Sequence, residues 1–431
     1  MKREIEAALD RSWHVLECVC PTGNVIKGIA SREYHKENSE TPFSMFTASQ
    51  ILWAMTSSKN FPKTHYLVIE LLAKINELLN KDIISKHDRV LSKSFWLLAL
   101  TCAGQPIQSE PYRNLFQNLI DTQRETGAWG TCSKDDDNLR ATALTVIAFC
   151  ECLKRIGSTS NTPAYNLNGK LQCAVRYMIS NQKKDGYYLR SVKSINPEEK
   201  VTFQPGIEVT AWVTYAMVKC LTIVEFSNEE EAKIKRAIQT SVKWLMSQKI
   251  SEVATKTEIE EEFYIKEDIE MTHEYGAGSL DILILALVEY RHSKIYIYTK
   301  EIDSYINKAI TRLLEDESNG SWYDKNSGGY TKVWKTAYAV KCLSVFCEYL
   351  NEEIEFRKKL IRKTILFIHA LAHKSIRVLF SIPMIILYFI AGFVLLFLKI
   401  NIESPIIGII SLILGAIGII ISIYYGKKGN S

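Results

Sequence analysis

The sequence predicts an all-α protein, an (α/α)6 toroid of six helical hairpins followed by a juxtamembrane helix and two transmembrane helices. Three observations predict this fold. Helix-length segments come in pairs, an amphipathic segment and then an apolar one. A glycine-aromatic turn motif recurs between the members of a pair. Two long uncharged runs lie near the end of the sequence.

The second segment of each pair is apolar around most of its circumference, which is typical of a helix buried on nearly all sides. These segments open at Thr47, Ser94, Thr142, Thr210, Ser279 and Thr336. The amphipathic segments before them are predicted at about 4–18, 65–80, 111–123, 169–182, 230–248 and 301–316. Hairpins with a polar outer helix and an apolar inner helix can close into a ring, which removes the exposed ends of an open helical stack.

The connections from outer to inner helix carry the turn motif. It occurs as Gln123-x3-Gly127-x-Trp129, Gln182-x3-Gly186-x-Tyr188 and Asp316-x3-Gly320-x-Trp322. Glycine ends the outer helix, and the aromatic residue packs the returning chain. A Gln or Asp in the last turn can hydrogen-bond the loop backbone. We interpret the motif as structural.

Composition excludes several classes of protein. With 47% apolar and 23% charged residues the chain is not disordered, and a net charge of +5 with no aromatic-basic motif gives no indication of a nucleic-acid partner. The ten cysteines are scattered, and the N-terminal MKREIEAALDRSWHV contains no apolar signal region, so we expect reduced core thiols. No Cys or His spacing matches a metal site, so neither a metal nor a cofactor is expected.

The C-terminal part predicts membrane attachment. We expect the toroid over residues 1–350, a basic amphipathic juxtamembrane helix over 351–376, a transmembrane hairpin over 377–425 and a basic tail over 426–431. Val378–Leu398 and Pro405–Tyr425 contain no charge, and each is long enough to cross the hydrocarbon core. Basic residues flank the pair, which predicts an integral membrane protein with the toroid and both termini in the cytoplasm. Glycines in the second run could bring helices together, in the hairpin or between subunits of a homo-oligomer.

The loops that lead into the inner helices are expected to gather around one mouth of the ring. Two of them, at about 187–206 and 249–277, are long enough to suggest function. Polar residues expected at this mouth are Asp135, Asp136, Asp137, Arg140, Glu208, His273, Glu274, Asp324, Lys332 and Lys335. Aromatic residues expected to line the cavity, or to belong to the core, are Trp53, Trp96, Trp212, Tyr215, Trp334 and Tyr338.

QRETGAW and NQKKDGYY resemble the repeats of squalene and oxidosqualene cyclases, and the Thr-Ala openings are similar to those of cyclases and protein prenyltransferase β-subunits. The resemblance covers about one toroid, residues 1–350, whereas triterpene cyclases carry two. It implies an isoprenoid ligand and an acid in an Asp-x-Asp-Asp motif, for which Asp135, Asp136 and Asp137 are the candidates. The chain departs from that motif, because Arg140 stands at the acid's place relative to the helix start. The aspartates could instead be a solvated flank of the helix N-terminus.

Two related activities are not expected. Protein prenyltransferases bind zinc with Asp, Cys and His, but the matching openings here contain no Asp-x-Cys and place Lys335 where the His would be. Thioester domains of complement-type proteins need a Gly-Cys-Gly-Glu-Gln stretch, which is absent from the sequence. His273 and Glu274 could perform acid-base chemistry or lie on a charged surface flap.

Three hypotheses of function remain open. The first is a membrane-anchored toroid that acts as a ligand- or protein-binding sensor or effector, without the catalytic motif of its enzyme relatives. The second is a membrane-bound class II-type terpene cyclase, or another enzyme that processes isoprenoids. The third is a scaffold that binds a partner protein. The expected partners are the lipid bilayer, an isoprenoid or other small ligand and a second copy of the chain.

Overall fold

The computed structural model describes most of the first 374 residues. The described residues are 1–18, 45–56, 65–80, 89–106, 108–131, 137–156, 164–192, 202–255, 257–266, 269–293, 295, 300–318, 321–322 and 333–374. The chain divides into two compact units, Met1–Glu353 and Ile354–Ser431. The first unit contains the helical hairpins.

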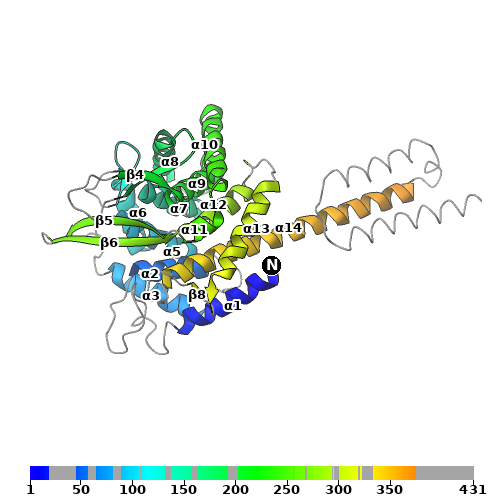
Figure 1. Ribbon diagram of the computed structural model, residues 1–431, viewed down its shortest axis with the longest axis horizontal. Helices are drawn as coiled ribbons and strands as arrows, with labels where there is room; N and C mark the ends of the chain where they lie inside the picture. The colour runs from blue at the N-terminus through cyan, green and yellow to red at the C-terminus, as the bar shows by residue number, and fades with distance from the viewer. Residues whose placement is uncertain are drawn as a thin grey trace, which may run out of the picture. The chain divides into compact units, whose positions relative to one another are not determined.

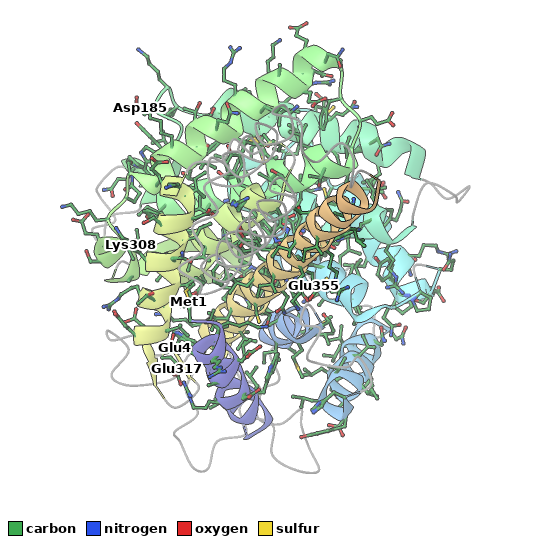
Figure 2. The ribbon with its side chains drawn as sticks, turned by 90° about the vertical axis from the view of Figure 1, so that its right-hand side faces the viewer. Met1, Glu4, Asp185, Lys308, Glu317 and Glu355 are labelled. Atoms are coloured by element: carbon green, nitrogen blue, oxygen red, sulfur yellow. The ribbon has the colours of Figure 1, made fainter. Side chains whose placement is uncertain are left out.

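The hairpins form an outer and an inner layer of helices, which confirms the predicted toroid (Figure 1). The outer helices are α1 (Lys2–Cys18), α3 (Tyr66–Asn80), α6 (Glu110–Asp121), α8 (Ala164–Asn181), α10 (Asn228–Met246) and α13 (Lys300–Glu315). The inner helices are α2 (Met45–Thr56), α5 (Val90–Ala103), α7 (Leu139–Ile156), α9 (Ile207–Ile223), α12 (Ser279–His292) and α14 (Val333–Lys374). Outer helices bury one stripe and carry their charges on the other face, as Lys308 on α13 illustrates in Figure 2.

The ring of inner helices is closed. Contacts run in order from α2 through α5, α7 and α9 to α12. Helix α14 completes the ring: Gln50 Nε2 on α2 donates to the Tyr338 hydroxyl at 3.3 Å, and the Arg291 guanidinium on α12 lies 5.6 Å from the Tyr349 ring centroid. In the outer layer α1 contacts α13, and Arg11 Nε donates to Glu317 Oε1 at 3.0 Å. Closure therefore buries both ends of the helical series.

The turn motif ties each hairpin to the next one. The backbone N–H of Trp129 donates to Thr142 Oγ1 at 2.9 Å, and the same bond joins Tyr188 to Thr210 at 3.0 Å. Gln123 Nε2 donates to the Gly127 carbonyl at 2.8 Å and to a carbonyl of α8 at 2.9 Å. The motif thus satisfies backbone groups at helix ends, as predicted.

The third copy of the motif differs in part. The Trp322 N–H donates to Thr336 Oγ1 at 3.3 Å, but Asp316 accepts from Arg312 Nη2 at 2.7 Å within its own helix region. Gly320 lies outside the described residues. In all three copies the inner helix begins three residues before its threonine, so these threonines lie inside the first turn and do not open the helix.

The fold is mostly helical, as predicted, but strands are present at the mouth where the sequence predicted loops. Two-stranded antiparallel ribbons precede α7, α9, α12 and α14. They are β1–β2 (Trp129–Gly130 and Asp137–Asn138), β3–β4 (Tyr188–Val192 and Thr202–Gly206), β5–β6 (Thr257–Lys266 and Ile269–Gly278) and β7–β8 (Glu317–Ser318 and Ser321–Trp322). The two loops expected to be long are ribbons because pairing satisfies their backbone groups, and a short helix, α11 (Ile250–Thr255), precedes β5.

The segment predicted as a juxtamembrane helix, 351–376, is helical as far as Lys374. Residues 352–373 belong to α14, which continues without interruption from the sixth inner helix to Lys374. Among the described residues no helix is both long and apolar enough to cross a membrane. The two predicted spans, within 377–425, and the basic tail, 426–431, lie outside the described residues.

Replacement of Gly127 by alanine is expected to lower the free energy of unfolding by about 2 kcal/mol. Gly127 has a φ of +88°, and a Cβ there would lie 2.5 Å from the Cys173 carbonyl oxygen of α8. Gly169→Ala is the matched control, because nothing lies within 4 Å of its Cβ position and alanine favours a helix. Thermal unfolding of the full chain followed by circular dichroism measures both. Equal stability of the two variants would contradict the packing role of Gly127.

Candidate functional site

The inner helices place residues on the ring axis at regular spacing. On α9 the axial residues are Glu208, Trp212, Tyr215 and Lys219, which share one face at intervals of four, three and four residues. The same spacing on α7 gives Arg140, Leu144, Ile147 and Glu151. Since these helices begin at one end of the ring, the axis carries a polar layer, two apolar layers and a second polar layer.

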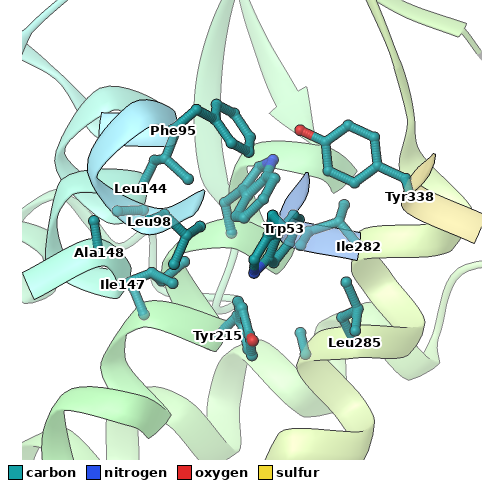
Figure 3. Close-up of a cluster of buried hydrophobic side chains, with 14 of the residues drawn as sticks. Trp53, Phe95, Leu98, Leu144, Ile147, Ala148, Tyr215, Ile282, Leu285 and Tyr338 are labelled. Carbon is teal, nitrogen blue, oxygen red and sulfur yellow. The ribbon is translucent and has the colours of Figure 1, made fainter. Parts of the chain in front are cut away.

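An aromatic layer fills the axis next to the mouth (Figure 3). It consists of Trp53 on α2, Phe95 on α5, Trp212 on α9 and Tyr338 on α14, each at most 6% exposed. The ring centroids of Trp53 and Trp212 are 6.4 Å apart, and those of Trp53 and Tyr338 are 5.9 Å apart in an edge-to-face arrangement. In the order of the ring, α2 and α9 are opposite helices. Their tryptophans therefore meet across the axis.

Arg140 and Glu208 form a buried ion pair on the mouth side of the aromatic layer. Arg140 Nε lies 3.0 Å from Glu208 Oε1, and the two side chains are 6% and 1% exposed. The indole Nε1 of Trp212 donates to the same carboxylate oxygen at 2.8 Å. A buried charge is stable only when it is paired and hydrogen-bonded, and these contacts meet that need. The sequence predicted both residues at the mouth, and the structure brings them together.

Asp281 is a buried carboxyl that sequence reasoning missed. It lies in the first turn of α12, is 2% exposed, and its Oδ2 has no hydrogen-bond partner among the described residues. Burial raises its pKa to about 7; Lys335 opposes the rise, and Asp316 adds to it. An acidic residue near the start of the apolar run SLDILILALVEY was the available signal.

The acidic triplet is only partly described. Asp137 lies on β2, and its Oδ1 is 3.5 Å from Arg124 Nη1 in the turn after α6. Its charge also helps to raise the pKa of Tyr177 on the outer helix α8, after burial of that phenol. Asp137 therefore contacts the outer layer. Asp135 and Asp136 lie outside the described residues.

The other predicted site residues fall into three groups. Tyr215 lies on the axis, with its ring centroid 6.4 Å from that of Trp212, and Trp96 is buried in the core. His273 and Glu274 lie on β6, opposite Glu262 and Glu261 on β5, but their side chains are outside the described part. The same holds for the Trp334 side chain and for Asp324 and Lys332.

No group of His, Cys, Asp or Glu residues in the described part of the chain is arranged to hold a metal ion. The polar groups that the structure does gather at the mouth are an ion pair, a phenol, an amide and Asp281. Burial raises the pKa of Tyr338 well above its ordinary value, so its hydroxyl stays protonated at neutral pH, and it accepts a hydrogen bond from Gln50 Nε2. These groups can donate and accept hydrogen bonds at the mouth.

Comparisons with known proteins agree on the fold. The family model of the A-macroglobulin TED domain matches residues 105–257, and no curated protein matches. Similar solved structures include the Lin0763 protein of Listeria innocua, with 13% identity over 80% of this chain and 98% of that one and a TM-score of 0.54. An unsaturated glucuronyl hydrolase specific for heparin has 12% identity over 81% and 97% and a TM-score of 0.51. The type II terpene cyclase MstE of Scytonema, bound to merosterolic acid A, has 12% identity over 80% and 98% and a TM-score of 0.49.

These comparisons concern the fold and not the chemistry. The solved structures are all far below the identity at which an activity can be transferred. The TED match covers less than half of the chain, which contains no Gly-Cys-Gly-Glu-Gln stretch. The chain has an α/α-toroid fold, and the Lin0763 protein and the glucuronyl hydrolase are similar to it in fold alone.

Replacement of Asp281 by asparagine is expected to raise stability at high pH. The folded pKa of about 7 lies above the ordinary 3.8, so the folded state holds the proton more tightly and the free energy of unfolding falls as pH rises between these values. Asparagine removes this loss, with a gain of about 4 kcal/mol at pH 8 that disappears near pH 4. Thermal unfolding at a series of pH values measures the difference, and the exposed Asp185→Asn is the control. A gain independent of pH would contradict the assignment.

Proposed function

We propose that this chain is a membrane-attached toroid that binds a ligand or a protein partner and acts as a sensor or effector, without terpene cyclase activity. The aromatic layer is the observation that carries this proposal. A cyclase has to hold a folded isoprenoid chain in a hollow at the centre of its toroid. Here Trp53 and Trp212 come from opposite walls and lie 6.4 Å apart, so side chains occupy that volume.

The groups at the mouth give a second argument. Class II cyclisation needs a carboxylic acid that donates a proton to a carbon-carbon double bond or an epoxide. At the corresponding helix start stands Arg140, and an arginine side chain remains protonated in proteins and cannot serve as such an acid. Its partner Glu208 is ion-paired with Arg140 and accepts a hydrogen bond from the Trp212 indole, and both contacts favour the ionised carboxylate. Asp137 contacts Arg124 of the outer layer and not the axis.

One observation favours the enzyme alternative. Asp281 is a buried carboxyl whose protonated form is stabilised at neutral pH, as an acid catalyst requires. Its electrostatic neighbours are Lys335, Tyr338 and Cys342 on α14 and Asp316 after α13. It also directly precedes Ile282, which belongs to the apolar filling of the axis (Figure 3). We retain a terpene cyclase-like enzyme as the second candidate on this ground.

Membrane attachment is proposed from the sequence and from the exposed part of α14. The uncharged runs Val378–Leu398 and Pro405–Tyr425 can each cross a bilayer. Before them, Lys358, Lys359, Arg362 and Lys363 are exposed on α14, together with Ile365 and Leu366, which are 57% and 68% exposed. Each such basic residue contributes about 1 kcal/mol on an anionic surface. We infer that the toroid lies on the cytoplasmic side, with homo-oligomers formed through the hairpin.

The full chain is expected to float with phosphatidylcholine-phosphatidylserine vesicles and to stay bound after an alkaline carbonate wash. The triple variant Lys358→Gln, Lys359→Gln, Arg362→Gln should lose the preference for anionic vesicles but resist the wash, because the uncharged runs remain. The matched control is a triple variant on the outer helices, Lys233→Gln, Lys235→Gln, Lys308→Gln. A chain that leaves the vesicles on washing would contradict the proposed anchor.

A leakage assay tests the effector role separately. Dye-loaded vesicles that stay intact with the oligomer, squalene and geranylgeranyl diphosphate would count against the effector role.

Incubation of the full chain with squalene or geranylgeranyl diphosphate is expected to give no cyclised product in mass spectrometry. The aromatic layer occupies the substrate volume, and the acid position holds Arg140. A cyclised product that disappears in Asp281→Asn or Asp137→Asn, but persists in the exposed-loop variant Asp185→Asn, would replace the sensor proposal with the enzyme alternative.

A further inference from the structure

A second polar layer lies on the ring axis, at the end opposite the mouth. We name it the closed-end cluster; its members are Cys102, Glu151, Lys219, Glu289 and Lys341, one each from α5, α7, α9, α12 and α14. Glu151 and Lys219 follow the axial residues Ile147 and Tyr215 by one helical turn. The aromatic layer therefore separates this cluster from the ion pair of Arg140 and Glu208.

Lys219 forms ion pairs with both carboxylates of the cluster. Its Nζ lies 2.8 Å from Glu151 Oε1 and 3.4 Å from Glu289 Oε1. Burial alone would lower the pKa of Lys219, but the surrounding acidic groups, Glu289 and Glu151 among them, raise it above its ordinary value. Burial also opposes the charge of Glu151, yet Lys219 holds the pKa of this carboxyl below its usual range. Lys219 and Glu151 therefore stabilise each other's charged forms, and Glu289 contacts the same ammonium.

Lys341 has no such partner. Its side chain is 7% exposed, and its Nζ lies 5.0 Å from the Trp53 ring centroid. Among the described residues no carboxylate lies within 4.0 Å of this nitrogen. Burial, and then the positive charge of Lys219, lowers the pKa of Lys341. The indole face stabilises an ammonium but accepts none of its three N–H bonds in the ordinary geometry.

The Lys341 side chain is largely buried, but its ammonium is not sealed from solvent, so an anion can reach it and supply the acceptor that the described residues do not. The side of the cluster toward solvent is accessible. The side chains of Glu151 and Glu289 are 20% and 22% exposed, and Cys102 is half-buried. The neighbouring carboxylates repel a highly charged ligand, so a group with one or two negative charges fits best. Carboxylate and phosphate groups have this chemistry.

We propose that the closed-end cluster binds a small oxyanion, the carboxylate or phosphate group of a ligand, through Lys341. The inference rests on the proposed role as a ligand-responsive toroid and assigns that role a site and a ligand class. Lys341 lies on α14, three residues after Tyr338 of the aromatic layer. An occupant at Lys341 thus acts on the helix that closes the ring.

Binding should weaken as pH rises. An oxyanion favours the protonated amine, and the pKa of Lys341 in the empty site lies below the ordinary lysine value. Molecules in which Lys341 is neutral must therefore take up a proton from solvent when the anion binds. Raising the pH enlarges that fraction and lowers the affinity.

Thermal unfolding of the full chain in sodium acetate or sodium phosphate, against sodium chloride of equal ionic strength, tests the site. At ten times the dissociation constant, acetate or phosphate is expected to raise the melting temperature by about 2 °C. The rise should be lost in Lys341→Met and kept in Lys308→Met, an exposed lysine on α13 (Figure 2). No rise with either anion, or a rise kept in Lys341→Met, would overturn the proposal.

A second variant covers the case in which Lys341→Met does not fold. Glu151→Gln removes one repelling carboxylate and should enlarge the rise with both anions, whereas the exposed Glu252→Gln should not. An unchanged rise in Glu151→Gln would place the anion elsewhere and overturn the assignment.

The outcome of this test is separable from the outcome of the membrane-binding test of the proposed function. A rise without vesicle attachment would refute the membrane role alone, and attachment without a rise would refute the oxyanion site alone.

Discussion

The contact between Trp53 and Trp212 across the ring axis is the constraint on which this structure depends. Inner helices that are apolar on all sides need buried neighbours in every direction, including toward the centre. A toroid with a hollow centre would leave these faces to water or to a ligand. Here the two indoles, with Phe95 and Tyr338, supply the missing neighbours. The apolar sequence of the inner helices is thus explained without any bound molecule.

The filled axis also separates two kinds of polar chemistry. On the mouth side the charges of Arg140 and Glu208 neutralise each other and are almost completely buried. On the other side Lys219 has two acidic partners and Lys341 has none among the described residues. Since a low-dielectric aromatic layer lies between them, each polar layer acts on its own surroundings. A toroid of this construction offers two different chemical surfaces at its two ends.

The sequence predicted local features well and the orientation of single residues poorly. Gly127 and Trp129 could be assigned because a turn motif acts within a few residues, and the apolar runs gave the inner layer. Asp281 could not be assigned, because one residue of offset from the axial Ile282 turns a side chain by about 100° around the helix. The ribbons were missed because their pairing satisfies backbone groups and leaves little periodicity in loops such as TEIEEEFYIK. Pairs such as Arg140 with Glu208 depend on which helices become neighbours.

The glycines of the turn motif determine how wide the ring is. Gly127 and Gly186 bring their turns so close to the next outer helix that a Cβ would lie 2.5 Å and 2.4 Å from its carbonyl oxygens. Because this approach sets the step from one hairpin to the next, the circumference cannot shrink when an axial side chain becomes smaller. Loss of an indole at the centre would leave a void of fixed size instead of a tighter barrel. The same fold could therefore acquire a ligand chamber by a single aromatic-to-small exchange.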